Sequence, residues 1–266
     1  MKNAPIGIFD SGIGGLTIAN AIKKVLPNEN IIYFGDTEHL PYGEKSKEAI
    51  QNFSKKIIQF LVKEQCKIIV IACNSASSVI KNNISKNLEL PFIFNVIDPV
   101  IEEITKNNTH YKIGVIGTKA TIDSNIYAQK IKKNSNNINV SSLATPLLAP
   151  MIEERFINGG ISQSIIANYL SNKKLANIDL LILACTHYPL IQKEIKRYYN
   201  ENINVLDSPN IIAKYIAIQL QKNKLLKNSN NTQHHFYVSN YTESFERSAK
   251  FFFKKTIKLE EKKLFA

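Results

Sequence analysis

Short apolar runs alternate with longer amphipathic stretches along the whole of this chain. Runs of strand length occupy residues 6–9, 31–34, 68–72, 92–96, 113–116, 138–140, 180–184 and 205–206. Segments with helical periodicity lie between several of these runs, at residues 16–26, 49–62, 79–88, 122–131 and 190–199. Because alternation of strands and helices is typical of parallel sheets with helices on their faces, the sequence predicts an α/β fold.

Two segments in the first half of the chain each resemble a later segment. The segment IGIFDSG from Ile6 is similar to IGVIGTK from Ile113, and IIVIACNSA from Ile68 is similar to LLILACTHY from Leu180. The two offsets, 107 and 112 residues, are close to each other, and each match covers a strand and the loop after it. We therefore expect two pseudo-symmetric parallel-sheet lobes, with the active site in the cleft between them.

The chain is expected to cross between the two lobes twice. The first lobe is predicted to contain residues 1–97 and 209–266, and the second lobe residues 98–208. The C-terminal part would return to the first lobe with a helix at 211–221, a strand at 235–238 and a helix at 242–253. The stretch after Lys254, rich in Lys and Glu, is predicted to be a solvated last helix.

Cysteine count, charge and hydropathy limit the classes of function. Three cysteines do not make a disulfide framework, which fits a reducing cytoplasm. No apolar run approaches the roughly 20 residues that cross a bilayer, so neither a membrane nor a secreted protein is expected. The net charge of +12 could indicate nucleic-acid binding, but the lysines are scattered and only Arg155, Arg197 and Arg247 are arginines. Nucleic acid is not expected as a main partner.

The residues that follow predicted strands are the candidates for a site, because ligands of open α/β sheets bind beyond the carboxyl ends of the strands. Cys73 and Cys185 occupy matching positions after two similar strands, so two facing lobes would bring both thiols to one cleft. A single free cysteine is more often a small buried apolar residue. The matched pair favours chemistry, whereas Cys66 precedes a strand and is assigned to the core.

Asp10 follows the first strand and begins a glycine-rich turn. Gly12, Gly14 and Gly15 do not form the G-x-G-x-x-G pattern of dinucleotide-binding loops. We expect these glycines to let the backbone approach a small ligand, while Asp10 handles a proton or the ammonium group of that ligand.

Other polar residues extend the candidate site. His187 lies two residues after Cys185 and would serve as a proton partner for its thiol; the alternative is a solvent-facing histidine at a helix cap. One of Glu153 and Glu154 is expected in the cleft, and their spacing does not rank them. No C-x-x-C, H-x-x-x-H or H-E-x-x-H pattern occurs, so no zinc site is expected.

Six motifs, in their order along the chain, resemble those of the glutamate racemase family. They are Asp10-Ser11-Gly12 with Gly14-Gly15, Gly35-Asp36, Pro41-Tyr42-Gly43, Ala72-Cys73-Asn74, Gly117-Thr118-Lys119-Ala120-Thr121 and Cys185-Thr186-His187. The resemblance covers nearly the whole chain. Ser75 departs from the threonine that the family usually has, and residues 150–154 match loosely.

The resemblance implies a two-lobed enzyme in which Cys73 and Cys185 are the two acid/base groups, without pyridoxal phosphate or a metal. It implies that Asp10 supports Cys73, and that His187 and Glu153 support Cys185. The implied substrate contacts are Asp10, Ser11, Tyr42, Gly43, Asn74, Ser75, Thr118, Thr121, Thr186 and His187. A cytoplasmic homodimer that supplies D-glutamate for peptidoglycan is also implied by the family.

Two alternatives remain open at this stage. An aspartate racemase or another amino-acid racemase of the same superfamily would share the thiol pair, although the CTH and LPYG segments favour glutamate. A two-lobed ligand-binding or regulatory protein would have no need of two cysteines at strand ends. A nucleotide-binding oxidoreductase is disfavoured because a phosphate loop is missing from the sequence.

Overall fold

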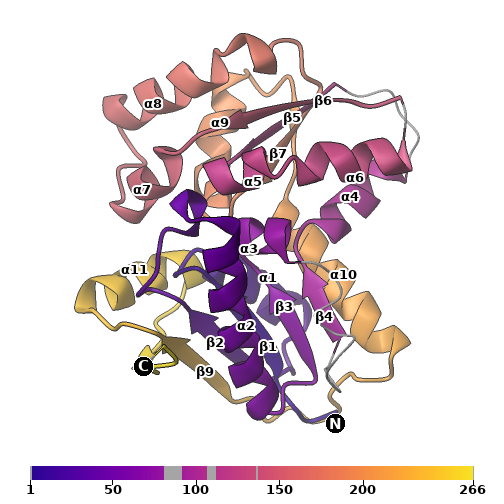
Figure 1. Ribbon diagram of the computed structural model, residues 1–266, viewed down its shortest axis with the longest axis vertical. Helices are drawn as coiled ribbons and strands as arrows, with labels where there is room; N and C mark the ends of the chain where they lie inside the picture. Colours follow the sequence, from indigo (N-terminus) through magenta and orange to yellow (C-terminus); the bar gives the residue numbers. More distant parts are fainter. Residues whose placement is uncertain (1, 81–91, 107–111, 136, 266) are drawn as a thin grey trace.

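Two parallel β-sheets, each covered by helices, form the two halves of the molecule (Figure 1). The structure is a computed structural model, and it describes residues 2–80, 92–106, 112–135 and 137–265. The predicted two-lobed α/β fold is confirmed. No helix in these ranges combines the length and the apolar character that a bilayer crossing requires.

The first sheet contains six strands in the order β10-β9-β2-β1-β3-β4, and every neighbouring pair is parallel. Its strands are β1 (Ile6–Asp10), β2 (Ile31–Gly35), β3 (Ile68–Ile71), β4 (Phe92–Asn95), β9 (His234–Val238) and β10 (Glu260–Glu261). β1, β2 and β3 are buried along their full length, which is why they are continuous apolar runs in the sequence.

The second sheet has the order β6-β5-β7-β8 and is also parallel throughout. Its strands are β5 (Lys112–Gly117), β6 (Asn139–Ala144), β7 (Leu180–Ala184) and β8 (Asn204–Val205). The order β2-β1-β3-β4 in the first sheet is repeated as β6-β5-β7-β8 in the second. The sequence similarities therefore link β1 with β5 and β3 with β7, at equivalent places in the two lobes.

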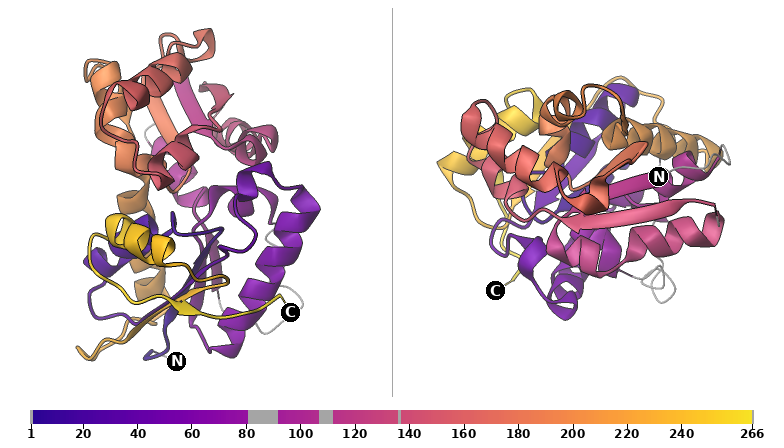
Figure 2. Two further views of the ribbon diagram at one scale, coloured as in Figure 1. Left: turned by 90° about the vertical axis from the view of Figure 1, so that its left-hand side faces the viewer. Right: turned by 90° about the horizontal axis from the view of Figure 1, so that it is seen from above.

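Helices cover both faces of each sheet (Figures 1 and 2). They are α1 (Leu16–Val25), α2 (Lys47–Lys63), α3 (Asn74–Val79), α4 (Asp98–Thr105), α5 (Lys119–Asp123), α6 (Ile126–Asn134), α7 (Leu148–Glu153), α8 (Gly160–Leu170), α9 (Gln192–Tyr198), α10 (Ser208–Lys222) and α11 (Glu243–Phe253). α2 packs with one face of the first sheet, and α1, α10 and α11 pack with the other. The apolar cluster on this second face continues into the second lobe through residues of α7, α8 and β7.

In both sheets the direction in which successive strands are added reverses at an equivalent strand. The chain leaves β1 for β2 on one side, and β3 lies on the other side of β1. In the second sheet β6 and β7 flank β5 in the same way. Ligands of open α/β sheets bind at such switch points, beyond the carboxyl ends of the strands. The loops after β1 and β3 face the loops after β5 and β7, since residues of all four loops line one cavity.

Three sequence expectations differ from the structure. The predicted last helix after Lys254 is wrong: this segment is extended and ends in β10, because Ile257 and Leu259 alternate with polar residues and bury their side chains. The predicted helix at 122–131 is two helices, separated at Asn125, whose backbone is left-handed. For the helix predicted at 79–88, Val79 ends α3, Ile80 caps it, and residues 81–88 lie outside the described residues.

The C-terminal segment joins the first sheet, where β9 pairs with β2. Just before β2 and β3 begin, the buried Lys67 ammonium donates to Glu29 Oε2 at 2.5 Å and to the Leu225 carbonyl at 2.8 Å. The other oxygen of Glu29 accepts from the Lys227 backbone N–H at 2.9 Å. One buried ion pair thus fixes the start of the C-terminal segment to the first lobe.

Removing this ion pair is expected to destabilise the fold. We expect Glu29→Gln to lower the free energy of unfolding by about 3 kcal/mol, because it leaves the Lys67 ammonium buried without a counter-charge. Glu103→Gln is the matched control, since Glu103 pairs with Lys106 at the surface and should change stability by less than about 1 kcal/mol. Urea unfolding measures both variants. Equal effects would contradict a structural role for the buried pair.

Candidate active site

A cavity of about 200 Å³ lies where the strand ends of the two lobes meet. Besides the two cysteines, nine of its lining residues were predicted as site residues from the sequence: Ser11, Tyr42, Gly43, Asn74, Ser75, Thr118, Glu153, Thr186 and His187. Cys73 and Cys185 line it as well. Both thiols therefore face one small cavity, one from each lobe.

Cys73 is held by the start of α3. It is the N-cap residue of this helix, and its sulfur accepts a hydrogen bond from the Ala76 backbone N–H at 3.5 Å. Its thiol lies 3.6 Å from the Ser11 hydroxyl, to which it donates. Burial raises the pKa of the Cys73 thiol to about 12, and the nearby Asp10 carboxylate adds to this rise. At neutral pH this group is a thiol that can donate a proton.

Cys185 directly follows β7 and has a different partner. Its sulfur lies 3.6 Å from His187 Nδ1, and His187 Nε2 lies 2.8 Å from Glu153 Oε1. Burial alone would lower the pKa of His187, but its hydrogen bonds to Cys185 and Glu153 outweigh burial and raise this pKa well above the ordinary value. An imidazolium at this place stabilises negative charge on the Cys185 sulfur.

The structure distinguishes the two candidate glutamates. Glu153 ends α7 and contacts His187, whereas Glu154 is exposed. The buried His187 is also packed against Phe252 of α11, with ring centroids 5.2 Å apart. It is not the solvent-facing cap that was the alternative reading of the sequence.

Two predicted residues, Asp10 and Thr121, lie behind the cavity wall and do not line it. Asp10 accepts from the Gly12 backbone N–H at 3.1 Å and from the Thr186 hydroxyl at 3.5 Å. Burial raises the pKa of the Asp10 carboxyl, while the nearby His187 opposes that rise. The buried Asp10 carboxyl is therefore not placed to bind a ligand ammonium directly. Its hydrogen bonds are to groups of the cavity wall, the Gly12 backbone and the Thr186 hydroxyl.

Hydroxyl groups connect the lobes around the cavity. The Ser75 hydroxyl of the first lobe lies 2.9 Å from the Thr118 hydroxyl of the second, which in turn lies 3.1 Å from Thr121. On the other side, the Thr17 hydroxyl donates to the Thr186 carbonyl at 2.9 Å. These groups can reorient their O–H bonds and so can donate to an anionic ligand.

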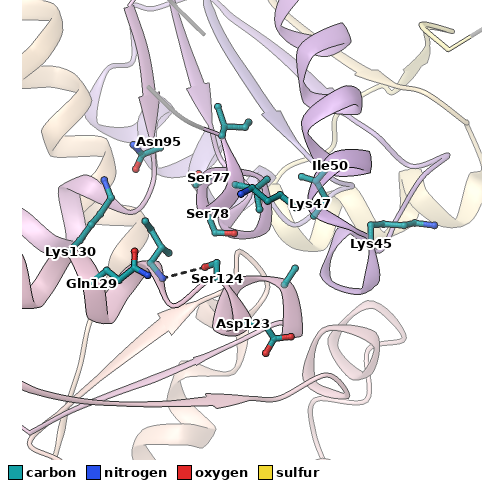
Figure 3. Close-up of a pocket in the computed structure, with 14 residues that line it drawn as sticks. Lys45, Lys47, Ile50, Ser77, Ser78, Asn95, Asp123, Ser124, Gln129 and Lys130 are labelled. Carbon is teal, nitrogen blue, oxygen red and sulfur yellow. Dashed lines mark hydrogen bonds between the residues drawn. The ribbon is translucent and has the colours of Figure 1, made fainter. Parts of the chain in front are cut away.

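A larger cavity, about 700 Å³, also lies between the lobes, and Figure 3 shows its lining. Its walls carry lysines and short polar side chains, among them Lys45, Lys47, Asn95 and Ser124. Neither Cys73 nor Cys185 lines it. Volume alone would favour this cavity, but the titratable groups with hydrogen-bond partners suited to proton transfer are in the smaller one.

Comparison with known proteins agrees with this geometry. A family model described as Asp/Glu/Hydantoin racemase matches residues 16–216. Glutamate racemase 3 of Caldanaerobacter subterraneus is 38% identical over 251 residues, which cover 94% of this chain and 91% of that protein. The chain belongs to this racemase family. The resemblance read from the motifs is confirmed, and the protein is an isomerase.

Solved racemase structures share the complete fold. The crystal structure of glutamate racemase from Francisella tularensis, in complex with D-glutamate, matches with a TM-score of 0.92 and 38% identity over 100% of this chain and 99% of that chain. A glutamate racemase isoform from Bacillus anthracis matches with a TM-score of 0.92 and 34% identity, covering 99% of each chain. The racemase fold therefore extends beyond the segment that the family model matches.

Two residues that shape this racemase site, Tyr33 and Ser239, were not predicted from the sequence, whereas Asp36 was part of a motif but had no role assigned to it. The Tyr42 hydroxyl donates to Asp36 Oδ2 at 2.6 Å, and the other Asp36 oxygen accepts from the Ser239 hydroxyl at 2.8 Å. The buried Tyr33 hydroxyl donates to the Gly12 carbonyl at 2.8 Å. The position of Asp36 after a strand drew attention to it, but Ser239 is more than 200 residues away in sequence and gives no local signal.

Gly14 and Gly15 have a role other than the one expected. A Cβ atom on Gly14 would lie 2.4 Å from His187 Cε1, and one on Gly15 would lie 2.5 Å from Asp10 Cβ. These two glycines allow protein groups to approach the turn, not a ligand. Gly12, which lines the cavity, is the one that fits the expectation.

Proposed function

We propose that this racemase interconverts L- and D-glutamate, with Cys73 and Cys185 acting on opposite faces of the α-carbon. The observation that carries this proposal is the position of the two thiols: they line one cavity from equivalent strand ends of two pseudo-symmetric lobes. The relatives at 34–38% identity are glutamate racemases by name, which supports glutamate over aspartate as the substrate.

Inversion by proton transfer needs a base on one face of the carbon and an acid on the other. In one direction the Cys185 sulfur, as thiolate, takes the α-proton, and the Cys73 thiol donates its proton to the opposite face. The C–H bond on one side breaks as the new C–H bond forms on the other, so the product is the mirror image. The reverse direction exchanges the two roles.

The environments of the two sulfurs are unequal. The raised pKa of Cys73 keeps it protonated in the free enzyme, while the His187 imidazolium supports negative charge on Cys185. The enantiomer whose α-hydrogen faces Cys185 requires Cys185 as the thiolate and the proton on Cys73. The other enantiomer requires the proton to be on Cys185 first, and exchange with solvent supplies that state.

The α-hydrogen of an amino acid is only weakly acidic, so the site must stabilise charge that develops on the substrate. None of the described lining residues of the cavity is a lysine or an arginine. We assign the binding of the substrate carboxylates to the side chains of Ser11, Asn74, Ser75, Thr118 and Thr186. Asn74 is itself fixed by the Tyr127 hydroxyl, which donates to its Oδ1 at 2.7 Å.

Glutamate and aspartate can be compared directly. We expect L-glutamate to lose its optical activity in the presence of the protein, without added pyridoxal phosphate and after dialysis against a chelator. L-Aspartate, shorter by one methylene, should react more slowly. Polarimetry measures both substrates. Preference for aspartate would overturn the substrate assignment, and loss of activity on dialysis would overturn the cofactor-free mechanism.

Glu153 is proposed to act through His187, and its replacement has a pH signature. Glu153 raises the pKa of His187, so Glu153→Gln should lower that pKa, and the loss of activity on the alkaline side should begin at lower pH. A hydrogen bond to a charged group contributes about 1.5 kcal/mol, so its loss in Glu153→Gln should lower the rate of racemisation roughly tenfold. Glu154→Gln is the matched control, and its pH profile should follow the original. Identical profiles for the two variants would exclude this role for Glu153.

We further infer that the product D-glutamate serves peptidoglycan synthesis in the cytoplasm, and that the enzyme acts as a homodimer. The role rests on the family relationship. Restored growth of a bacterial strain that requires D-glutamate, on expression of this chain, is the expected result. Failure of a soluble, active protein to support growth would contradict it.

A further inference from the structure

Asp36 is a fully buried carboxylate that contacts the active-site wall, and it is not one of the groups assigned to proton transfer. Tyr42 and Ser239 donate hydrogen bonds to it. His39 is its third partner, with Nδ1 2.9 Å from Asp36 Oδ1 and 3.1 Å from Oδ2. Within the described part of the chain, His39 is the one side chain able to carry a positive charge that lies within 4.0 Å of Asp36. Because a buried carboxylate is costly unless it is paired and hydrogen-bonded, His39 stabilises Asp36 in its place.

The Tyr42 hydroxyl is occupied by its contact with Asp36. Burial and the charge of Asp36 raise the pKa of Tyr42 above its ordinary value, so the hydroxyl remains protonated and acts as a donor. A phenolic hydroxyl has one hydrogen, and here it is donated to Asp36 and not to a ligand. Tyr42 and Gly43 both line the cavity and form what we call the 42–43 wall. Asp36 therefore fixes the position of this wall.

The 42–43 wall is closely packed against the second lobe. A Cβ atom on Gly43 would lie 2.7 Å from Thr118 Cβ. Thr118 lines the cavity as well, and its hydroxyl lies 2.9 Å from that of Ser75. A shift of the wall would therefore either displace Thr118 or open a gap beside it.

Two aromatic rings pack against the His39 imidazole. The Phe53 ring of α2 is stacked on it, with centroids 4.0 Å apart and planes at 24°, and the Phe265 ring meets it edge-on at 4.4 Å. The two phenylalanine rings are 5.7 Å apart, and the Lys56 ammonium lies over the Phe265 ring at 5.3 Å. Aromatic rings favour such stacked and edge-to-face contacts, so His39 has a defined orientation although 23% of its side chain is exposed.

The segment after β9 holds the loop that carries Asp36 and His39. The Glu38 backbone N–H donates to the Ser239 hydroxyl at 2.9 Å, and the Asn240 backbone N–H donates to the Thr37 hydroxyl at 2.9 Å. Because Ser239 accepts from Glu38, its own hydrogen is directed to Asp36. The last part of the chain thus supports one wall of the active-site cavity, through Ser239 and through Phe265.

We propose that His39 is a positioning residue for substrate binding: through Asp36 it holds the 42–43 wall, and Phe265 holds His39. This role rests on the proposed racemisation of glutamate. A cavity wall contacts the substrate alike in the ground state and in the transition state, so loss of its position raises KM and leaves kcat nearly unchanged. Loss of a proton-transfer group would instead lower kcat.

Kinetics of the full-length protein with glutamate test this role. His39→Ala should raise KM at least about fivefold and change kcat by less than about twofold, because a hydrogen bond to a buried carboxylate is lost. His39→Asn keeps an N–H near the place of Nδ1, so its KM should stay within about twofold of the original. His235→Ala is the matched control, since the His235 ring stacks on Tyr237 of β9 and does not line the cavity. A fall in kcat without a rise in KM, or no rescue by asparagine, would contradict the proposal.

Phe265→Ala should act in the same direction and more weakly. It removes a ring contact of His39 but keeps the hydrogen bond to Asp36, so we expect a KM about threefold higher. Phe92→Ala is the matched control, because it removes a ring pair with Phe94 that lies on β4, outside the cavity. Equal changes of KM in the two variants would exclude support of His39 by Phe265.

Tyr42→Phe separates action through Asp36 from any other route. The double variant with His39→Ala should raise KM no more than about twofold beyond the larger single effect, because both changes act on the same carboxylate. Full additivity of the two effects would mean that His39 acts on the substrate by another route, and the proposal would be wrong.

Hydrogen exchange measures the position of the wall without reference to catalysis. In His39→Ala the backbone amides of residues 42–44 should exchange at least about fivefold faster than in the original protein, whereas His235→Ala should leave them unchanged. Equal exchange in the two variants would overturn the proposal, whether or not the protein racemises glutamate. Faster exchange in His39→Ala, in a protein inactive on glutamate, would support the positioning of the wall and count against the proposed function alone.

Discussion

Replacing either Cys73 or Cys185 by alanine should reduce racemisation by at least about 10³-fold. A positioned acid or base contributes roughly 10²–10⁴-fold to a rate, and each variant lacks the group on one face of the carbon. No other described thiol lines the cavity, so no neighbouring group of the same chemistry replaces the missing one. Polarimetry with L-glutamate and with D-glutamate measures the loss in both directions.

Each cysteine variant should also keep one half of the reaction. The remaining thiol can still remove the α-hydrogen from the enantiomer that faces it and return deuterium from heavy water to the same face. We therefore expect Cys73→Ala and Cys185→Ala to exchange the α-hydrogen of opposite enantiomers. Cys66→Ala is the control, because Cys66 is buried in the core beside Gly7 and should be dispensable for activity. Substantial racemisation by either active-site variant would contradict the two-thiol mechanism.

The second large effect is expected from a residue that has no side chain. In Gly14→Ala the new methyl group would lie 2.4 Å from His187 Cε1 and 2.5 Å from the Thr186 hydroxyl. Relief of these contacts requires a shift of about 1 Å, and a displacement of that size at a catalytic group costs roughly 10²-fold in rate. We expect a fall of this order in kcat/KM for glutamate.

Gly160→Ala is the matched control for this change. Gly160 begins α8, and a Cβ atom there would have no neighbour within 4 Å, so activity should be unchanged. Circular dichroism establishes that both variants are folded. If Gly14→Ala folded and retained full activity, close packing of the turn against His187 would not matter for catalysis.

Most of the fold could be predicted because its signals are local. Buried parallel strands are continuous apolar runs, and β7 begins and ends where its run LLILA does. The repeated Ala-Cys pair marked equivalent strand ends, and the equal strand orders of the two sheets explain why it did. Most of the predicted site residues share this property, because they lie at the end of a strand, just after it, or in the first turn of a helix; Glu153, which ends α7, is the exception.

The features that were missed depend on contacts between distant segments. Ser239 reaches Asp36 only because β9 pairs with β2, and no periodicity in either segment reports that pairing. The loop position of Asp10 was read correctly, but its burial behind Gly12 and Thr186 depends on the packing of the second lobe. The stretch after Lys254 has a charged composition that favours a helix, whereas the two buried side chains Ile257 and Leu259 set an extended conformation.

The two thiols lie in unequal environments. Negative charge is supported beside Cys185 by His187, while burial and Asp10 disfavour it at Cys73. The repeated lobes place the two sulfurs at equivalent positions, and different neighbours surround them. The site is symmetric in the order of its strands and not in the side chains that contact the two sulfurs.

The source of the hydrogen delivered to the product distinguishes two thiols on opposite faces from a single group that moves one hydrogen. Unlabelled L-glutamate is incubated with the protein in deuterium oxide, and both enantiomers are separated early in the reaction for mass spectrometry. If two thiols act on opposite faces, the D-glutamate formed carries deuterium at the α-carbon, because the donating thiol exchanges with solvent, while the remaining L-glutamate retains hydrogen. D-Glutamate that retains the original hydrogen would mean that a single group moves it from face to face, and the two-thiol account would be wrong.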